Sequence, residues 1–149
     1  MWTRFMDMHS GGGCKEPPYE YIYIEAPEEE ARVIFYNRFG HNPDRVTCTC
    51  CGEDYSTGES ETLAQSSAYD RRCKYVYRDK NGKIIKTPKY DYDRRDYGEG
   101  VTHGYEETKG SQSVEEYSKS KYVLIISASE IKPEERKGEV PEQGYVWKD

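Results

Sequence analysis

The sequence predicts an α+β protein, built from a small mixed or antiparallel sheet with two or three short helices. Short segments in which apolar and polar residues alternate indicate strands, and separate segments in which apolar residues recur every three or four positions indicate helices. Only 34% of the 149 residues are hydrophobic, so the core is expected to be small for the length of the chain. A second core would leave each half near the lower limit of independent folding, and we therefore expect a single domain over residues 1–149.

The first third of the chain predicts two strands and a helix in succession. Residues 1–13 are expected to form a short strand that enters a glycine loop, and Tyr19–Glu25 alternates tyrosine with isoleucine, as a strand does. Pro27 and the three glutamates after it match the first turn of a helix, whose apolar stripe runs to Phe39. Gly40 is expected to end that helix, because glycine readily adopts the left-handed backbone that follows a helix.

The middle of the chain predicts shorter elements. A second helix is expected at about residues 61–69. Asn81 and Gly82 predict a tight hairpin turn between two strands, because both residues tolerate positive φ angles. Ser113 and Glu116 match a capping box, which predicts the start of a third helix.

The last third of the chain predicts two strands joined by a polar segment. Residues 121–127 are the most continuous apolar run and are expected to form a central strand covered on both faces. Residues 131–138 are expected to be a charged connector. Residues 144–147 are expected to close the sheet as a terminal strand.

Residues 87–112 are predicted to form one long loop rich in tyrosine and aspartate. Tyrosine alternates with charged residues from Tyr90 to Tyr97 and no aliphatic residue occurs there, so this stretch buries too little apolar surface to fold alone. A solvated, flexible loop is the simpler interpretation. The alternative is a partner-binding loop, in which Tyr90, Tyr92 and Tyr97 anchor a partner at low entropic cost.

Three of the five cysteines crowd into one short motif. Cys48 and Cys51 form a C-x-x-C-G knuckle, the turn in which two thiolates converge on a tetrahedral ion, and Cys50 adds a third thiol. Thiolate and imidazole ligands favour zinc, so the motif predicts a structural zinc that staples the fold, with His9 on the glycine loop as a further ligand. The sequence has no second C-x-x-C, which leaves four other candidate ligands open: Cys14, His41, Cys73 and His103. The alternative is a set of reduced cysteines buried as small apolar side chains.

A catalytic zinc would need an open coordination position and a neighbouring acid or base. Glu53 and Asp54 follow the knuckle and supply carboxylates. The zinc deaminases, however, place their glutamate one residue past the histidine ligand, as H-x-E, and their cysteines in a P-C-x-x-C turn, and neither pattern occurs around His9 or Cys48. A zinc-dependent enzyme acting on a nucleotide or nucleic acid is therefore the second hypothesis on function.

The charge balance argues against direct binding to nucleic acid, because 28 acidic residues outnumber 22 basic ones and give a formal charge of −6. The longest apolar run, Tyr122–Ile126, is too short to span a bilayer. The opening residues include Arg4 and Asp7 and lack the apolar core of a signal peptide. We expect a soluble protein of a reducing cytoplasm, where an odd number of crowded cysteines fits a thiol-metal site better than disulfides.

Three segments of the chain carry a resemblance: MWTRFMDMHSGGG at residues 1–13, VIFYNRFGHNPDRVTCTCCG at residues 33–52 and IKPEERKGEVPEQGYVW at residues 131–147. They resemble a group of small accessory proteins encoded by tailed bacteriophages and prophages. The resemblance implies the cytoplasm of a bacterial host, where accessory phage proteins often inhibit host defence or modulate host enzymes.

The first hypothesis on function is therefore a non-enzymatic binding protein with a structural zinc and no membrane or nucleic-acid partner. Its acidic, tyrosine-rich surface would bind a host protein, for example a nucleic-acid-handling defence protein such as a CRISPR effector. Carboxylates would occupy the basic groove that otherwise receives phosphates, and tyrosines would supply the buried anchors.

Overall fold

The computed structural model describes residues 1–8, 13–48, 54–86 and 100–148, and it describes only the backbone of Cys48 and Lys86. These residues form a mixed α+β structure, which confirms the predicted fold class. They divide into two compact units: unit 1 comprises residues 1–66 and 118–149, and unit 2 comprises residues 67–117. A single domain stays a prediction, because a division by contacts does not establish whether either unit folds alone.

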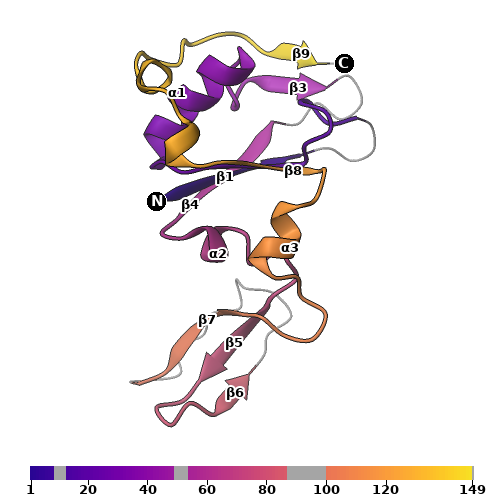
Figure 1. Ribbon diagram of the computed structural model, residues 1–149, viewed down its shortest axis with the longest axis vertical. Coiled ribbons are helices and arrows are strands. Elements are labelled where there is room, and N and C mark those ends of the chain that lie inside the picture. Colours follow the sequence, from indigo (N-terminus) through magenta and orange to yellow (C-terminus); the bar gives the residue numbers. More distant parts are fainter. Residues whose placement is uncertain (9–12, 49–53, 87–99, 149) are drawn as a thin grey trace. The chain divides into compact units, whose positions relative to one another are not determined.

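Unit 1 holds most of the secondary structure (Figure 1). Its elements are β1 (Trp2–Asp7), β2 (Tyr21–Ile24), α1 (Glu28–Phe39), β3 (Val46–Cys48), β4 (Tyr55–Ser60), α2 (Leu63–Ser66), β8 (Val123–Ile126), the 3-10 turns η1 (Ala128–Glu130) and η2 (Pro133–Arg136), and β9 (Val146–Lys148). Unit 2 contains β5 (Lys74–Arg78), β6 (Ile84–Lys86), β7 (Thr102–Glu106) and α3 (Val114–Ser118), whose last residue belongs to unit 1. Every helix in these ranges falls short of the length and apolarity that a membrane span requires.

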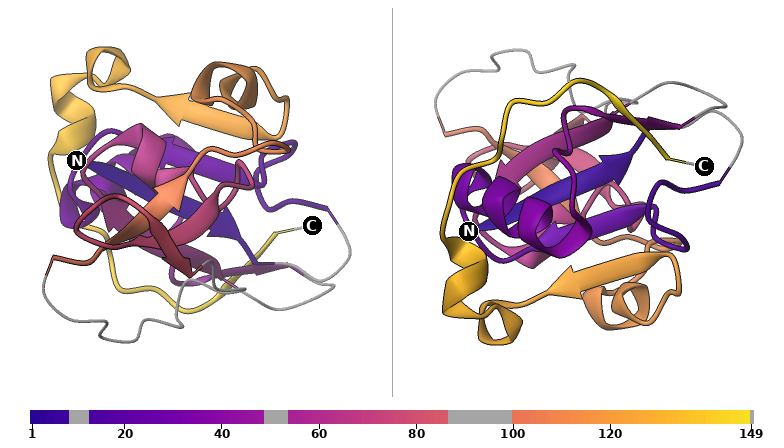
Figure 2. Two further views of the ribbon diagram at one scale, coloured as in Figure 1. Left: turned by 90° about the horizontal axis from the view of Figure 1, so that it is seen from below. Right: turned by 90° about the horizontal axis from the view of Figure 1, so that it is seen from above.

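A four-stranded mixed sheet forms the base of unit 1, in the order β4-β1-β2-β8. β1 runs antiparallel to both of its neighbours, and β8 runs parallel to β2. α1 lies across one face of this sheet, as the view from above shows (Figure 2). The rings of Phe5 and Phe35 meet there with 4.8 Å between their centroids, and Ile22, Ile24 and Ile126 are fully buried in the same core. Burial of these apolar side chains holds the helix to the sheet.

α1 begins and ends as the sequence predicts. Pro27 supplies no side-chain cap, and the backbone N–H of Glu28 donates instead to the carboxylate of Glu59 on β4 at 2.7 Å. That carboxylate places an anion at the positive end of the helix dipole. Arg32 pairs with Glu28 one turn away at 2.9 Å. Gly40 ends the helix in the left-handed region with φ at +78°.

Two strands lie elsewhere in the architecture than the sequence indicates. Residues 121–127 contain β8, which is an edge strand and not a central one, because among the described strands it pairs with β2 alone. The two central strands are β1 and β2, each of which has neighbours on both sides. Residues 144–147 do not close this sheet, since β9 pairs in parallel with β3 as a separate two-stranded sheet.

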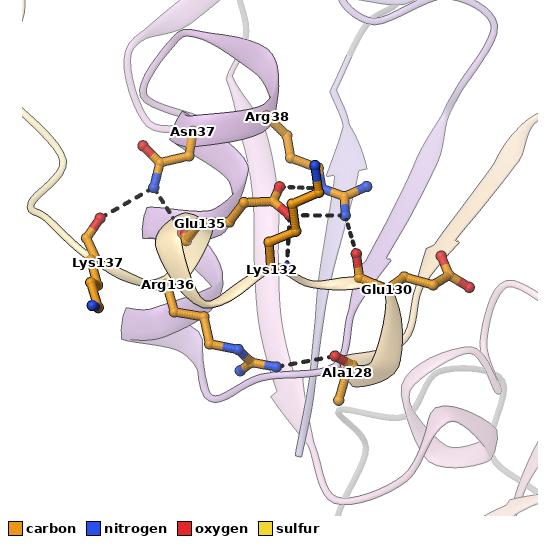
Figure 3. Close-up of polar contacts among 8 residues, drawn as sticks. All are labelled: Asn37, Arg38, Ala128, Glu130, Lys132, Glu135, Arg136 and Lys137. Carbon is orange, nitrogen blue, oxygen red and sulfur yellow. Dashed lines mark hydrogen bonds and ion pairs between the residues drawn. The ribbon is translucent and has the colours of Figure 1, made fainter.

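The predicted charged connector at residues 131–138 is a packed segment on α1 (Figure 3). The side-chain amide of Asn37 donates to the backbone carbonyl of Glu135 at 2.7 Å. Arg38 donates from Nε to the carboxylate of Glu135 at 2.7 Å and from Nη2 to the carbonyl of Glu130 at 2.7 Å. These contacts hold η1 and η2 against α1.

Two short helices were predicted, and only α3 starts where the sequence indicates: α2 was expected to begin at Glu61 with Ser60 as its cap, but it begins at Leu63. α2 covers less than the expected residues 61–69, and it begins where the Thr62 hydroxyl accepts the backbone N–H of Gln65 at 3.1 Å. α3 begins after Ser113, whose hydroxyl accepts the backbone N–H of Glu116 at 3.1 Å. The predicted cap at Ser113 is therefore confirmed.

Unit 2 is built on an antiparallel sheet in the order β6-β5-β7. The predicted hairpin joins β5 to β6 and has Gly82 at φ +81°, but Asn81 does not adopt the positive φ that the expected tight turn requires. Residues 102–106, which the sequence assigns to the long loop, form β7 and pair with β5 over their whole length. The pairing opposes Tyr75 and Tyr105, whose rings lie 5.0 Å apart. Cross-strand aromatic contacts stabilise this strand without the aliphatic residues by which a strand is usually recognised.

Candidate functional site

Most of the residues singled out by the sequence lie outside the described ranges: His9, Cys50, Cys51, Glu53, Tyr90, Tyr92 and Tyr97. Cys48 is the last residue of β3, described by its backbone. Among the described residues, no group of three or more His, Cys, Asp and Glu side chains could hold a metal ion. The zinc knuckle and the tyrosine anchors therefore stay predictions.

The chain segments next to the knuckle and the glycine loop meet in a buried polar cluster in unit 1. We define this cluster by two groups of contacts, Asp7–Lys15–Tyr55 and His41–Glu16–Lys148, which meet at the adjacent residues Lys15 and Glu16. Asp7 ends β1, Tyr55 begins β4, and the two are register partners in the sheet. Sequence reasoning missed the cluster, because charged residues in isolation are expected to be solvated.

An ion pair lies at the centre of the cluster. The ammonium of Lys15 lies 2.6 Å from Oδ1 of Asp7, and both side chains are fully buried. Oδ2 of Asp7 accepts the backbone N–H of Lys15 at 2.8 Å, and the ammonium also donates to the carbonyl of Met8 at 3.2 Å. The ammonium further lies 5.4 Å from the centre of the Tyr55 ring. Such a pair is stable in the interior only because most of its hydrogen-bonding capacity is used.

His41 joins the cluster to the end of α1. Its Nδ1 lies 3.0 Å from the carbonyl of Phe39 and 3.4 Å from the carboxylate of Glu16, which is also 3.2 Å from the ammonium of Lys148. The imidazole is 1% exposed, and its ring meets the Phe35 ring edge-on at 5.5 Å. Burial, with a smaller contribution from the positive charge of Lys148, lowers the pKa of His41 to about 4. His41 is therefore neutral at pH 7.

Asp54 and Tyr55, which follow the knuckle in the sequence, also have shifted pKa values. Burial raises the pKa of the Tyr55 hydroxyl far above its usual value, and the charges of Asp7 and Glu16 add to the effect. Burial likewise raises the pKa of the Asp54 carboxyl, with a further contribution from the charge of Asp44. The Tyr55 hydroxyl and Oδ1 of Asp54 are buried atoms without a hydrogen-bond partner in the described structure. Asp54 thus has the properties of an acid that stays protonated more readily than usual.

The other candidate thiols are not activated for nucleophilic chemistry. Burial raises the pKa of Cys14, and the charges of Asp7 and Glu20 add to that shift. Burial also raises the pKa of Cys73, which lies in unit 2. A thiol with a raised pKa stays protonated at pH 7, and the thiolate is the reactive form.

A second feature of unit 1 is an aromatic surface on β9. Tyr145, the residue before β9, is 54% exposed, and Trp147 within β9 is 60% exposed. The guanidinium of Arg45, the residue before β3, lies 5.4 Å from the centre of the Tyr145 ring. We call these three residues the β9 aromatic surface. The alternation of Tyr, Val and Trp was visible in the sequence, but its exposure was not.

No protein-family model matches this chain, and comparisons with curated proteins and with solved structures also give no match. Its function must therefore be inferred from its own residues.

Proposed function

We propose that this chain is a non-enzymatic phage accessory protein that binds a host protein and inhibits or modulates it. The observation that supports the proposal best is the β9 aromatic surface. Tryptophan, tyrosine and arginine are the residue types that dominate protein interfaces, and two large rings that are more than half exposed favour a role in contact with a partner.

The charge of unit 1 favours a basic partner. Unit 1 has 11 lysines and arginines against 18 aspartates and glutamates, a formal charge of −7, whereas unit 2 carries a formal charge of +1. A negative field accelerates association with a positive surface and disfavours acidic partners. A host defence protein that handles nucleic acid, such as a CRISPR effector in the bacterial cytoplasm, has a basic groove of the required sign. Occlusion of that groove is the proposed mechanism.

Two further features complete the proposal. Tyr90, Tyr92 and Tyr97 would supply additional anchors for the partner. A structural zinc, held by Cys48 and Cys51 with other thiol or imidazole ligands, would stiffen unit 1. Rigid presentation reduces the entropy lost on binding and so favours affinity.

The partner can be identified by cross-linking and pull-down from bacterial lysate, after which binding is measured with both proteins purified. The variants Tyr145→Ala and Trp147→Ala are expected to weaken binding by roughly 2 kcal/mol each, about thirtyfold, while Tyr122→Ala serves as a matched control because this tyrosine is 47% exposed and precedes β8. Affinity should also fall as salt rises, since charges are screened over about 10 Å at 0.1 M.

The result that contradicts the proposal is an affinity that neither the two β9 variants nor salt changes. Replacement of Tyr90, Tyr92 and Tyr97 together by alanine measures the contribution of the loop to binding separately, because the β9 aromatic surface stays intact.

One observation favours the second candidate, a zinc-dependent enzyme acting on a nucleotide or nucleic acid. Asp54 directly follows Glu53, and its raised pKa suits a general acid. Turnover of a nucleotide substrate by the zinc-loaded protein, abolished by Glu53→Gln or Asp54→Asn with folding unchanged, would replace the binding proposal.

A further inference from the structure

β8 leaves one edge of the mixed sheet in unit 1 open. Among the described strands it pairs with β2 alone, and it lies at the margin of that sheet (Figure 2). Natural edge strands usually carry charges, prolines or bulges that prevent pairing with another strand. β8 has none of these, because its register with β2 is continuous and its residues are Val123, Leu124, Ile125 and Ile126. An apolar edge of this kind favours pairing with a further strand.

The opposite edge of the same sheet, β4, is protected. It has the sequence YSTGES, in which Gly58 and Glu59 disfavour pairing with another strand. The carboxylate of Glu59 is also engaged, because it accepts the backbone N–H of Glu28 at the start of α1. Of the two edges, β8 is therefore the one suited to bind another strand.

The hydrogen bonds to β2 determine which backbone groups of β8 point outward. The carbonyl of Tyr122 accepts the N–H of Tyr21 at 3.2 Å, and the carbonyl of Ile126 accepts the N–H of Glu25 at 2.9 Å. The backbone groups of successive residues in a strand point to alternate sides. The N–H and the C=O of Ile125 therefore both point away from β2, towards the open edge.

We propose that β8 is a self-association surface, at which a second copy of this chain pairs antiparallel and joins the two four-stranded sheets. With Ile125 on the two-fold axis, the two copies of this residue exchange N–H···O=C bonds in both directions. Ser127 continues the extended backbone with φ −77° and ψ 158°, so its N–H can donate to the outward carbonyl of Val123 in the other copy. The pairing is symmetric and uses the same edge of both chains.

The charges at the two ends of β8 favour a second copy as the occupant. Lys121 precedes the strand and Glu130 follows it in η1, and both residues are exposed. Antiparallel pairing about Ile125 brings Lys121 of each copy to the end where Glu130 of the other copy lies. Two pairs of opposite charge then face each other, and such pairs stabilise neighbouring strands.

The dimer is expected to be weak. A pair of four-residue strands should bury less than a standard interface of about 1,600 Å². The formal charge of −6 on each chain also opposes association, although salt at about 0.15 M screens this repulsion beyond about 8 Å. β9 belongs to a separate sheet, so each dimer would present two copies of the β9 aromatic surface. A partner with two binding sites would gain affinity from this arrangement.

Amide hydrogen exchange, read by NMR in the unmutated protein, tests the pairing directly. The N–H groups of Ile125 and Ser127 should become protected as the protein concentration rises from micromolar to millimolar, because the dimer supplies their acceptors. The N–H of Leu124 points to β2, so it should be protected at every concentration and serves as the internal control. Sedimentation velocity over the same range should show a reversible equilibrium between monomer and dimer.

Two sets of variants identify the strand and its orientation. Ile125→Pro removes an outward N–H and no hydrogen bond to β2, so it should weaken the dimer roughly tenfold or more with circular dichroism unchanged. Lys121→Glu brings like charges together and should weaken the dimer about tenfold, and the addition of Glu130→Lys should restore it. Lys83→Glu, an exposed site in unit 2, makes the same change in net charge and should leave the dimer as it is.

Each contrary outcome overturns the proposal. A chain that stays monomeric at millimolar concentration does so, whether Ile125 is unprotected, covered by its own chain or covered by an extended segment of a host protein. A dimer that neither Ile125→Pro nor Lys121→Glu weakens is formed at another surface. A dimer that Lys121→Glu weakens and the double variant does not restore excludes antiparallel pairing. If Ile125→Pro fails to fold, the amide exchange and the charge variants still decide.

Discussion

The buried ion pair between Asp7 and Lys15 offers the sharpest test of the cluster. Lys15→Met keeps most of the side-chain volume but leaves the Asp7 carboxylate with only the backbone N–H of Lys15, at 2.8 Å, in place of the ammonium at 2.6 Å. Both side chains are fully buried, so water cannot replace the lost partner. An uncompensated buried charge costs about 3–5 kcal/mol, and we expect a loss of that size in the free energy of unfolding.

The double variant Asp7→Asn with Lys15→Met is the matched control. Asparagine can still accept the backbone N–H of residue 15, and no unpaired charge remains, so the double variant should recover most of the lost stability. Urea unfolding followed by circular dichroism gives the three free energies under one set of conditions. The argument is wrong if Lys15→Met loses less than about 1 kcal/mol, or if the double variant is as unstable as the single one.

Three further predictions concern the α1 contacts and the metal. Arg38→Met should lower the free energy of unfolding by about 1–2 kcal/mol, because it removes the partly exposed contact to Glu135 that is drawn in Figure 3. An unchanged urea midpoint would show that this contact contributes nothing to stability. The backbone N–H of Lys132, and then Arg38, lower the pKa of Glu135, so its stabilisation is present above the ordinary glutamate pKa and is lost as pH falls through the lowered value. Glu135→Gln should remove this part of the acid dependence, measured as Tm against pH, and an identical profile would contradict it. Elemental analysis should find about one zinc per chain, and Cys51→Ser should lose several kcal/mol, whereas an unchanged melting curve would favour the buried-thiol alternative.

The sequence by itself determined the local elements of this protein. The turn at Gly82, the end of α1 at Gly40 and the cap at Ser113 were all predicted, because each depends on residues within four positions of one another. The cysteine motif was equally recognisable, because the C-x-x-C-G pattern depends only on the spacing of neighbouring residues. Whether its thiols bind zinc remains a prediction, because Cys50 and Cys51 lie outside the described residues.

The tertiary structure decided what depends on distant residues. Asn37 contacts Glu135 across 98 positions, and no periodicity in a charged segment indicates that it packs on a helix. The apolar run of β8 has the composition of a central strand but forms an edge strand, because among the described strands it pairs with β2 alone. The same reason applies to the candidate site. His41 stands in a turn of the sequence, and only the tertiary structure buries its ring against Phe35 and so lowers its pKa to about 4.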